Sequence, residues 1–328
     1  MPWRLRKQMR AAAPADTYQT RMLNILAITS PIFLIIAIGF AAVQLGAMAK
    51  ADMRPLGRFV ISFALPALIF KALALRSFPE IMNASYLIAY GLGSLAVFFL
   101  LLAIALMQGK GVAASAIHGL GASMSNSGFI GYPVAMLLLG PPAVIGLALN
   151  MMVENMLMIP LALGIAESGA NGGESLRTIL SHAAARLVKN PLIIAIFAGA
   201  AVSLSGLAMP APVVKALDML ALASGAVALF VIGGTLAGIR LTGMLGDAGQ
   251  IAVAKLLLHP AAVFAFLMLV PPMEPELRKA ALIFASVPMV TIYPLLGQPY
   301  GQEEKCAAVL TLTTALSFLT MAAVLMLL

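Results

Sequence analysis

The hydrophobic and polar residues of this chain follow one another in long blocks. Apolar runs of about 20 residues, the length that crosses a hydrocarbon core of about 30 Å, alternate with short connectors rich in Gly, Pro and charge. Ten such runs predict membrane-spanning helices near residues 22–45, 56–76, 83–107, 114–139, 143–165, 190–207, 213–238, 250–270, 279–297 and 305–327. Membrane β-barrel strands alternate apolar and polar residues, and these runs do not. The pattern therefore predicts an all-α polytopic membrane protein.

The longest connector, residues 166–189, divides the spans into two sets of five. The first five-helix repeat covers residues 22–165 and the second covers residues 190–328. Because five is an odd number, the second set must enter the membrane from the opposite side. The sequence therefore predicts two inverted repeats, an architecture found in many secondary transporters.

Short strings in the two halves resemble each other at similar offsets. SPIFLIIAIGF begins at Ser30 in the first span, and NPLIIAIFAGA begins at Asn190 in the sixth. The dipeptide Tyr132-Pro133 in the fourth span has a counterpart, Tyr293-Pro294, in the ninth. These matches are short, so the odd number of spans per half remains the stronger argument for inversion.

Residues 1–21, MPWRLRKQMRAAAPADTYQTR, differ in composition from all that follows. They are basic, rich in alanine and without an apolar period. Two interpretations stay open: a disordered basic tail, or a misassigned start ahead of Met22.

Two spans carry residues that break helices at membrane depth. The fourth contains SNSGFIGYPVAMLLLG (125–140) and the ninth contains SVPMVTIYPLLGQPYG (286–301). Proline removes a backbone donor and clashes with the preceding turn, and glycine lets the chain unwind. Irregular backbone in a membrane is tolerated only where it is buried in protein or lines a cavity. The candidate substrate-binding residues are Ser125, Asn126, Ser127, Gly128, Tyr132, Pro133, Thr291, Tyr293 and Pro294.

A matched pair of breaks would frame a single site near the midplane, and the half-helix after each break would suit an anion. We expect Asn126, Ser127 and the backbone after Gly128 to bind it, with Thr291 and Tyr293 completing the site. The alternative is that the prolines are ordinary kinks, which are common in spanning helices.

Glu154 lies near the centre of the fifth span, where a carboxylate is costly and usually functional. Asn150 shares its helix face four residues earlier. We expect this pair to take part in ion coupling, with Glu154 carrying a proton. A structural carboxyl that is hydrogen-bonded to Asn150 is the alternative.

Lys255 lies near the expected start of the eighth span, where a lysine side chain snorkels to the interface. His259 follows one turn later, so a functional interpretation of Lys255 stays open. For His259 itself, helix capping is favoured over proton relay.

The composition supports the membrane assignment and excludes other classes. The chain is 62% hydrophobic and 10% charged, whereas soluble domains are about 25% charged. Its net charge of +8 comes from residues scattered over connectors, so a nucleic-acid partner is not expected. One cysteine, Cys306, excludes an internal disulfide. Enzyme motifs are absent and the three histidines are well separated, so we expect no enzyme activity, metal or cofactor.

The distribution of Lys and Arg predicts the orientation. One set of connectors carries Lys50, Arg54, Arg58, Lys110, Arg177, Arg186, Lys189, Arg240, Lys255 and Lys305, and the other carries Lys71, Arg76, Lys215, Arg278 and Lys279. Without the tail the first set is larger, which predicts a cytoplasmic central connector and both termini outside the cell membrane. The five basic residues of the tail, Arg4, Arg6, Lys7, Arg10 and Arg21, would level the count.

The sequence resembles the auxin efflux carrier family, most closely its bacterial branch of malonate and other carboxylate transporters. The resemblance covers about residues 22–327 and is carried by SPIFLIIAIGF, FALPALIFKALA, SNSGFIGYPVAMLLLG, KNPLIIAIFAG, KLLLHP and ASVPMVTIYP in this order. It implies ten spans in two inverted halves, with the fourth and ninth crossing at Pro133 and Pro294. Asn126 falls on the first crossover by resemblance.

The resemblance also implies a carboxylate substrate and, in many members, a homodimer in the bilayer. Plant members have a second Asn where Leu192 stands here, and their long central loop is missing. These departures favour a small carboxylate such as malonate over auxin.

The predicted function is a secondary transporter that moves a small organic anion across the inner membrane by alternating access. A sodium-coupled symporter of the bile-acid type is the alternative within this class, and a sodium requirement in flux assays would favour it. A membrane-embedded hydrolase or a sensor is the alternative from another class. The lack of a nucleophile–base pair argues against the first, and the lack of an attached soluble domain against the second.

Overall fold

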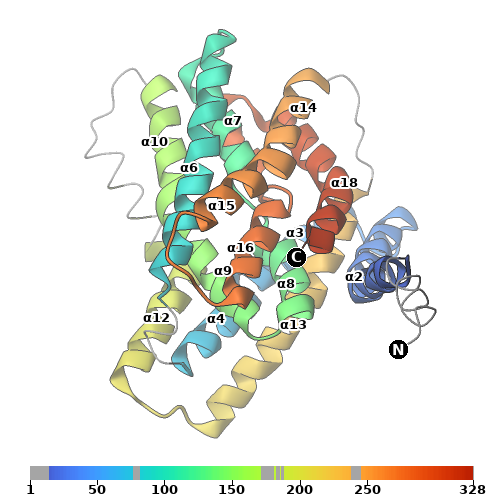
Figure 1. Ribbon diagram of the computed structural model, residues 1–328, viewed down its shortest axis with the longest axis vertical. Helices are drawn as coiled ribbons and strands as arrows, with labels where there is room; N and C mark the ends of the chain where they lie inside the picture. The colour runs from blue at the N-terminus through green and yellow to red at the C-terminus, as the bar shows by residue number, and fades with distance from the viewer. Residues whose placement is uncertain are drawn as a thin grey trace, which may run out of the picture.

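The computed structural model describes residues 15–76, 82–170, 181, 185, 188–237 and 245–327. Within these residues all regular structure is helical (Figure 1). The first half contains α2 (Ala15–Gln44), α3 (Met53–Phe59), α4 (Leu65–Ala74), α6 (Ala84–Met107), α7 (Val112–Ser123), α8 (Tyr132–Leu139), α9 (Pro142–Met152) and α10 (Ile159–Ala170). The second half contains α12 (Pro191–Ser205), α13 (Ala211–Leu236), α14 (Leu245–Val253), α15 (His259–Leu267), α16 (Pro275–Ser286), α17 (Tyr293–Gly297) and α18 (Glu303–Leu327).

Each span expected from the sequence overlaps one of these helices or a run of consecutive ones. In the described part of the chain six helices are long and apolar enough to cross a membrane: Lys50–Ala74, Ala84–Met107, Pro142–Ala170, Ala211–Leu236, Gly246–Leu267 and Glu303–Met326. The described part of the chain is therefore all-helical, and several of its helices have the length and composition of membrane spans.

The two segments outside the predicted repeats, residues 1–21 and the connector 166–189, are described only in part. Helix α2 begins at Ala15, so the end of segment 1–21 is helical, and residues 1–14 lie outside the described residues. No proline or glycine separates Ala15 from Met22, so nothing in the sequence interrupts the helix between them. Helix α10 continues to Ala170. Most of the remaining connector, 171–189, lies outside the described residues.

Four of the helical runs contain one wider, π-helical turn. Each of these turns is followed, two residues after its end, by a proline: η2 (Val60–Ala64) by Pro66, η3 (Ser127–Gly131) by Pro133, η4 (Val153–Met158) by Pro160 and η5 (Ala254–Leu258) by Pro260. Proline has no N–H for the carbonyl four residues earlier, and its ring crowds that carbonyl. A turn with hydrogen bonds between residues five apart accommodates the ring and re-pairs the carbonyls.

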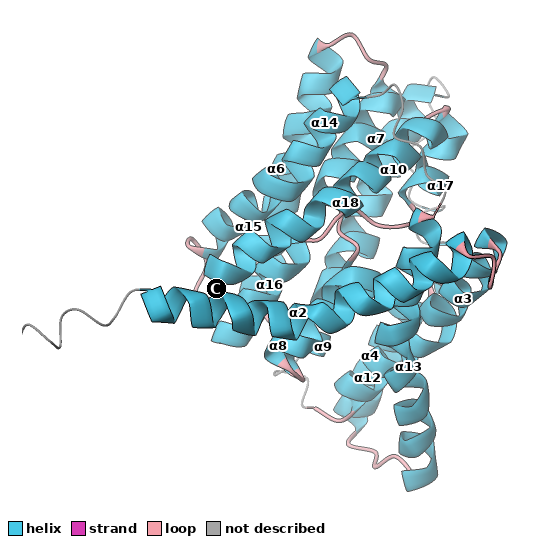
Figure 2. Cartoon of the chain, turned by 90° about the vertical axis from the view of Figure 1, so that its right-hand side faces the viewer, coloured by secondary structure: helices cyan, strands magenta, loops and turns pink. Residues whose placement is uncertain are grey.

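The helices pack as two groups. Helices α3, α4, α12 and α13 lie towards one end of the molecule, and α6, α7, α10, α14 and α15 towards the other (Figure 2). Helix α2 packs against α13, and α4 packs against both α12 and α13. We call α2–α4, α12 and α13 the first group. In the second group α6 packs against α7 and α15, α9 against α16, and α18 against α14 and α16.

Close backbone contact holds α2 against α13. A Cβ atom on Gly39 would lie 2.1 Å from the carbonyl oxygen of Phe230, and one on Gly233 would lie 1.9 Å from that of Ile36. No side chain larger than hydrogen fits at either position. This contact uses small residues as membrane helix interfaces do.

The outer surface of both groups is apolar. Leu222 on α13 is 82% exposed, Leu319 on α18 is 72% exposed and Leu34 on α2 is 62% exposed. Large apolar side chains in such numbers on the surface indicate contact with lipid rather than water.

Helices α7 and α16 share the same design. Each has 12 residues and ends at a serine, Ser123 or Ser286. Each serine hydroxyl donates to the carbonyl four residues earlier, at 2.8 Å to Gly119 and at 2.6 Å to Leu282. Both helices then give way to non-helical backbone. The predicted interruptions in the fourth and ninth spans are therefore confirmed.

Candidate functional site

The two interrupted segments meet inside the molecule. The backbone N–H of Asn126, in the first break, donates to the carbonyl oxygen of Pro288, in the second, at 2.7 Å. The side-chain amide of Asn126 also donates to the hydroxyl of Thr291, at 2.8 Å. Asn126 is 2% exposed. One buried asparagine thus joins the breaks through both its backbone and its side chain.

A cavity of about 290 Å³ lies beside this junction. Its polar lining is Ser125, Asn126, Ser127, Glu154, Asn155, Asn190 and Thr291. Ile61 and Leu65 border it from the first group of helices, whereas Met151 belongs to the second. Because Asn190 and Leu192 at the start of α12 also line it, the cavity has walls from both groups.

Backbone amides at the start of η3 provide donors in the cavity wall. The first N–H groups of a helix have no intrahelical acceptor. The N–H of Phe129 is already bonded to Asn126 Oδ1 at 3.3 Å, and those of Ile130 and Gly131 are bonded to the Asn126 carbonyl. The amides left for a ligand are therefore those of Ser127 and Gly128, rather than those beyond Gly128.

Glu154 is the acidic side chain in the lining of this cavity, and it is 1% exposed. Its Oε1 accepts hydrogen bonds from Ser127 Oγ (2.7 Å), Asn150 Nδ2 (3.1 Å) and the backbone N–H of Ser125 (3.2 Å). Its other oxygen, Oε2, has no hydrogen-bond partner among the described residues. Buried polar atoms are nearly always paired, so this oxygen is a candidate position for a proton or a ligand.

Lys255 lies on the other side of Ser125 and is 0% exposed. Its Nζ donates to Ser125 Oγ at 2.7 Å and to the carbonyl oxygen of Ala285 at 2.9 Å, and it lies 2.8 Å from His259 Nδ1. The expected snorkelling is therefore wrong. The physical reason is that α14 begins at Leu245, which places Lys255 deeper in the helix than the expected start at residue 250.

His259 is 0% exposed and its ring bridges two side chains. Nε2 lies 2.9 Å from Ser94 Oγ on α6, and Nδ1 faces Lys255. The ring therefore acts within a buried polar network.

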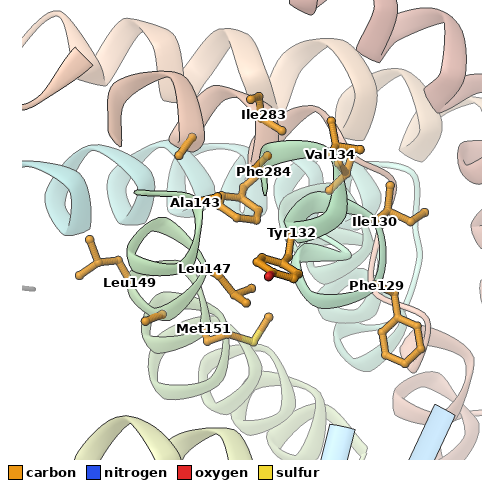
Figure 3. Packing of buried hydrophobic residues seen from close by; sticks show 14 of the residues in the cluster. Phe129, Ile130, Tyr132, Val134, Ala143, Leu147, Leu149, Met151, Ile283 and Phe284 are labelled. Atoms are coloured by element: carbon orange, nitrogen blue, oxygen red, sulfur yellow. The ribbon is translucent and has the colours of Figure 1, made fainter. Parts of the chain in front are cut away.

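The structure does not bring every candidate residue to the cavity. Tyr132 packs in the apolar core beside Met151 and Phe284 (Figure 3). Pro133 faces Gly225 on α13. Asn150 lies behind the lining, where it donates to Ser127 Oγ at 2.7 Å. These residues support the site without lining the cavity.

Tyr293 and Pro294 also lie outside the lining of this cavity. The hydroxyl of Tyr293 donates to the carbonyl oxygen of Ile117 at 3.0 Å. Tyr293 lines a second cavity of about 280 Å³, together with His118 and Lys305. Because Thr291 lines the first cavity and Tyr293 the second, α17 begins between the two.

Two contributors to the site were not singled out from the sequence. The Tyr90 hydroxyl lies 3.0 Å from Ser125 Oγ and 3.5 Å from Glu154 Oε1. Asn190 donates to Asn155 Oδ1 at 2.9 Å on the cavity wall. The sequence signal for Tyr90 was its spacing from Tyr86, which places two hydroxyls on one face of α6. Among the residues that the structure describes, no cluster of His, Cys, Asp or Glu could hold a metal ion.

Comparisons with known proteins show which family the chain is similar to. Residues 25–325 match the family model described as "Membrane transport protein". A protein of Rhizobium meliloti (strain 1021) named "Putative malonate transporter" is 30% identical over 301 residues, covering 91% of this chain and 94% of that protein. The "Lysosomal cholesterol signaling protein" of Mus musculus is 26% identical over 218 residues, which cover 63% of this chain and 25% of that protein.

Proposed function

We propose that this chain, which belongs to the membrane transport protein family, is a secondary transporter that carries a small organic anion across the cell membrane. The same family membership confirms the resemblance to auxin efflux carriers that its sequence motifs indicated. The protein is accordingly a multi-pass membrane transporter, and its substrate, coupling and mechanism are proposals.

The observation that carries the proposal is the cavity beside the two joined breaks. Its volume of about 290 Å³ is close to the lower end of small-molecule sites, about 300 Å³. Discontinuous helices in transporters direct the N-termini of half-helices at anionic groups of the substrate. Here the amides of Ser127 and Gly128 stand at such an N-terminus, beside the side chains of Asn126 and Thr291.

We take a small dicarboxylate such as malonate as the first substrate to test. One carboxylate would accept from the amides of Ser127 and Gly128. The apolar wall, which includes Ile61, Leu65 and Leu192, favours a compact substrate with few further polar groups. The name of the Rhizobium meliloti relative points to the same compound.

Glu154 is the proposed coupling group. An ionised carboxylate in the cavity wall would repel an anionic substrate, whereas a protonated one would not. Its Oε2 has no partner among the described residues and is therefore the oxygen at which a proton would bind. The substrate anion and one proton would then cross the membrane together.

We further propose that ten spans form two inverted five-helix repeats that work by alternating access. Helices α7 and α16 support this, because both end on a serine bonded to the carbonyl four residues earlier and both precede a break. The first group takes its helices from the start of each half, α2–α4 and α12–α13. Motion of this group against the other would open the cavity to alternate sides.

The orientation proposal keeps the central connector in the cytoplasm and both termini outside. Lys255 no longer belongs in the count of connector charges, since it is fully buried. Without residues 1–21, the remaining Lys and Arg residues of the connectors still favour the same side, nine against five. A homodimer in the bilayer is proposed from the family resemblance.

The test is uptake of labelled malonate by purified protein in proteoliposomes. Asn126→Ala removes the bond to Thr291 and the cap on Phe129, so we expect uptake to fall at least about tenfold, equivalent to about 1.4 kcal/mol. Asn83→Ala is the matched control, because Asn83 caps α6 by accepting from the N–H of Tyr86 at 2.9 Å and does not line the cavity. If Asn126→Ala takes up malonate at the wild-type rate, the junction of Asn126 with Thr291 is not part of the substrate site. Failure of the wild type to bind or exchange any small carboxylate would overturn the proposed function.

A further inference from the structure

The buried ammonium of Lys255 is fully coordinated. A lysine ammonium has three N–H donors, and Nζ has three acceptors within 2.9 Å: Ser125 Oγ, Ala285 O and His259 Nδ1. For Nδ1 to accept, the ring proton must be on Nε2, from which it donates to Ser94 Oγ at 2.9 Å. A neutral amine would make the same three contacts only with the opposite tautomer of His259, in which Nδ1–H donates to Nζ.

The acceptors of Lys255 come from both interrupted segments. Ser125 belongs to the break that follows α7. Ala285 is the penultimate residue of α16, and its carbonyl is among the last of that helix. The carbonyl end of a helix carries partial negative charge and attracts a cation. The ammonium therefore stabilises the ends of both segments where they meet.

This position and this set of acceptors are those of a bound cation. In transporters with discontinuous helices, unwound backbone carbonyls and the C-terminal ends of half-helices coordinate Na⁺. Here a backbone carbonyl at a helix end, a hydroxyl and an imidazole nitrogen surround an ammonium supplied by the chain itself. A second cation at this point would be repelled by Lys255.

We propose that Lys255 is a built-in cation that joins the two interrupted helices in place of Na⁺, so that the transport cycle does not depend on Na⁺. This inference rests on the proposed carrier function. Lys255 does not line the cavity, and it acts on the substrate through Ser125, which does. It is therefore a positioning residue, and its charge also favours an anion in the cavity.

Two substitutions distinguish this role from simple packing. Lys255→Ala removes the ammonium and leaves space among the three acceptors for an ion. Lys255→Met removes the charge but fills the same space with an apolar side chain. Lys215→Ala is the matched control, because Lys215 is exposed on α13 and distant in sequence from both breaks.

The first measurement is the thermal stability of the purified proteins in NaCl and in choline chloride at equal ionic strength. It needs no substrate. An ion that binds only the folded form raises the apparent melting temperature. We expect Na⁺ to raise the melting temperature of Lys255→Ala by about 2–4 °C. The melting temperatures of the wild type, Lys255→Met and Lys215→Ala should be the same in both salts.

The second measurement is malonate counterflow in the same two salts. We expect equal rates for the wild type, and a loss of at least about tenfold for Lys255→Ala in choline that Na⁺ partly restores. Na⁺-dependent stability or flux in the wild type would overturn the proposal. The proposal would also be overturned if Na⁺ affected Lys255→Met as strongly as Lys255→Ala. It would be overturned as well if Na⁺ failed to stabilise Lys255→Ala, or if Lys255→Ala could be recovered in neither salt.

The two proposals fail in different ways. If no carboxylate is transported but the stability results hold, the carrier function with this substrate class is wrong and the role of Lys255 stands. If malonate is transported only with Na⁺, the carrier function stands and the built-in cation is wrong.

Discussion

Glu154→Gln separates proton coupling from substrate binding. In the structure Ser127 Oγ, Asn150 Nδ2 and the backbone N–H of Ser125 donate to Oε1 of Glu154, and the Tyr90 hydroxyl lies 3.5 Å from it. A glutamine keeps an oxygen in that position and places its NH₂ where the unpartnered Oε2 lies. The variant therefore mimics a permanently protonated Glu154, and its free energy of unfolding should change by about 1 kcal/mol or less.

The alanine variant at the same position should behave differently. It would leave the Ser127 hydroxyl, one N–H of the Asn150 amide and the backbone N–H of Ser125 without their acceptor, and each buried unpaired donor costs about 1–3 kcal/mol. The sum, about 3–9 kcal/mol before relaxation, is a large part of the stability of a typical protein. We expect Glu154→Ala to unfold or to be recovered poorly, whereas Glu154→Gln should be purified in normal yield.

The assay compares two modes of transport in proteoliposomes. A gradient of about one pH unit stores about 1.4 kcal/mol per proton, so one coupled proton supports at most about tenfold accumulation of malonate. The wild type should accumulate malonate when the outside is acidic. Glu154→Gln should show no accumulation in response to the gradient, while malonate–malonate counterflow stays within about threefold of the wild type.

The control for this assay is Glu276→Gln, which neutralises an exposed glutamate in the first turn of α16. It should accumulate malonate as the wild type does. If Glu154→Gln still accumulates malonate in proportion to the pH gradient, the proton is carried elsewhere and Glu154 is a structural carboxyl.

Two further predictions concern packing around the site. Gly233→Val should prevent recovery of monodisperse protein on size exclusion, because even a Cβ would lie 1.9 Å from the Ile36 carbonyl oxygen. The control Gly225→Ala should be tolerated, because its Cβ would lie 3.7 Å from Pro133. Equal behaviour of the two variants would contradict the close contact of α2 with α13. Tyr293→Phe should lower stability by about 1–2 kcal/mol in a thermal-shift assay, because it leaves the buried Ile117 carbonyl without its hydroxyl donor. An unchanged melting temperature for Tyr293→Phe would show that this bond contributes little.

The interruptions could be predicted because their causes are local in the sequence. Pro133 and Gly128 disturb the helix wherever the rest of the chain lies, and a proline with nearby glycine and hydroxyl residues is visible by inspection. The burial of Glu154 was predictable for a similar reason, since the middle of a long apolar run is the middle of a membrane span.

The contacts of the site depended on tertiary structure and could not be predicted. The position of Lys255 is the clearest case, because a lysine five residues from an expected helix start can extend to the interface. The helix begins earlier, and the acceptors for the ammonium come from Ser125 and Ala285, which are far away in sequence. The sequence also does not show which face of a half-helix points at the cavity, which is why Tyr132 was included.

The wider turns that precede the four prolines change which side of each span faces its neighbours. One extra residue in a turn rotates every later side chain by about 100° around the helix axis. A span with such a turn therefore presents one side to its surroundings in one leaflet of the bilayer and a different side in the other leaflet. The run from α9 through η4 to α10 packs against α16 before the turn and against α7 after it. A single straight stripe of apolar residues could not serve both neighbours.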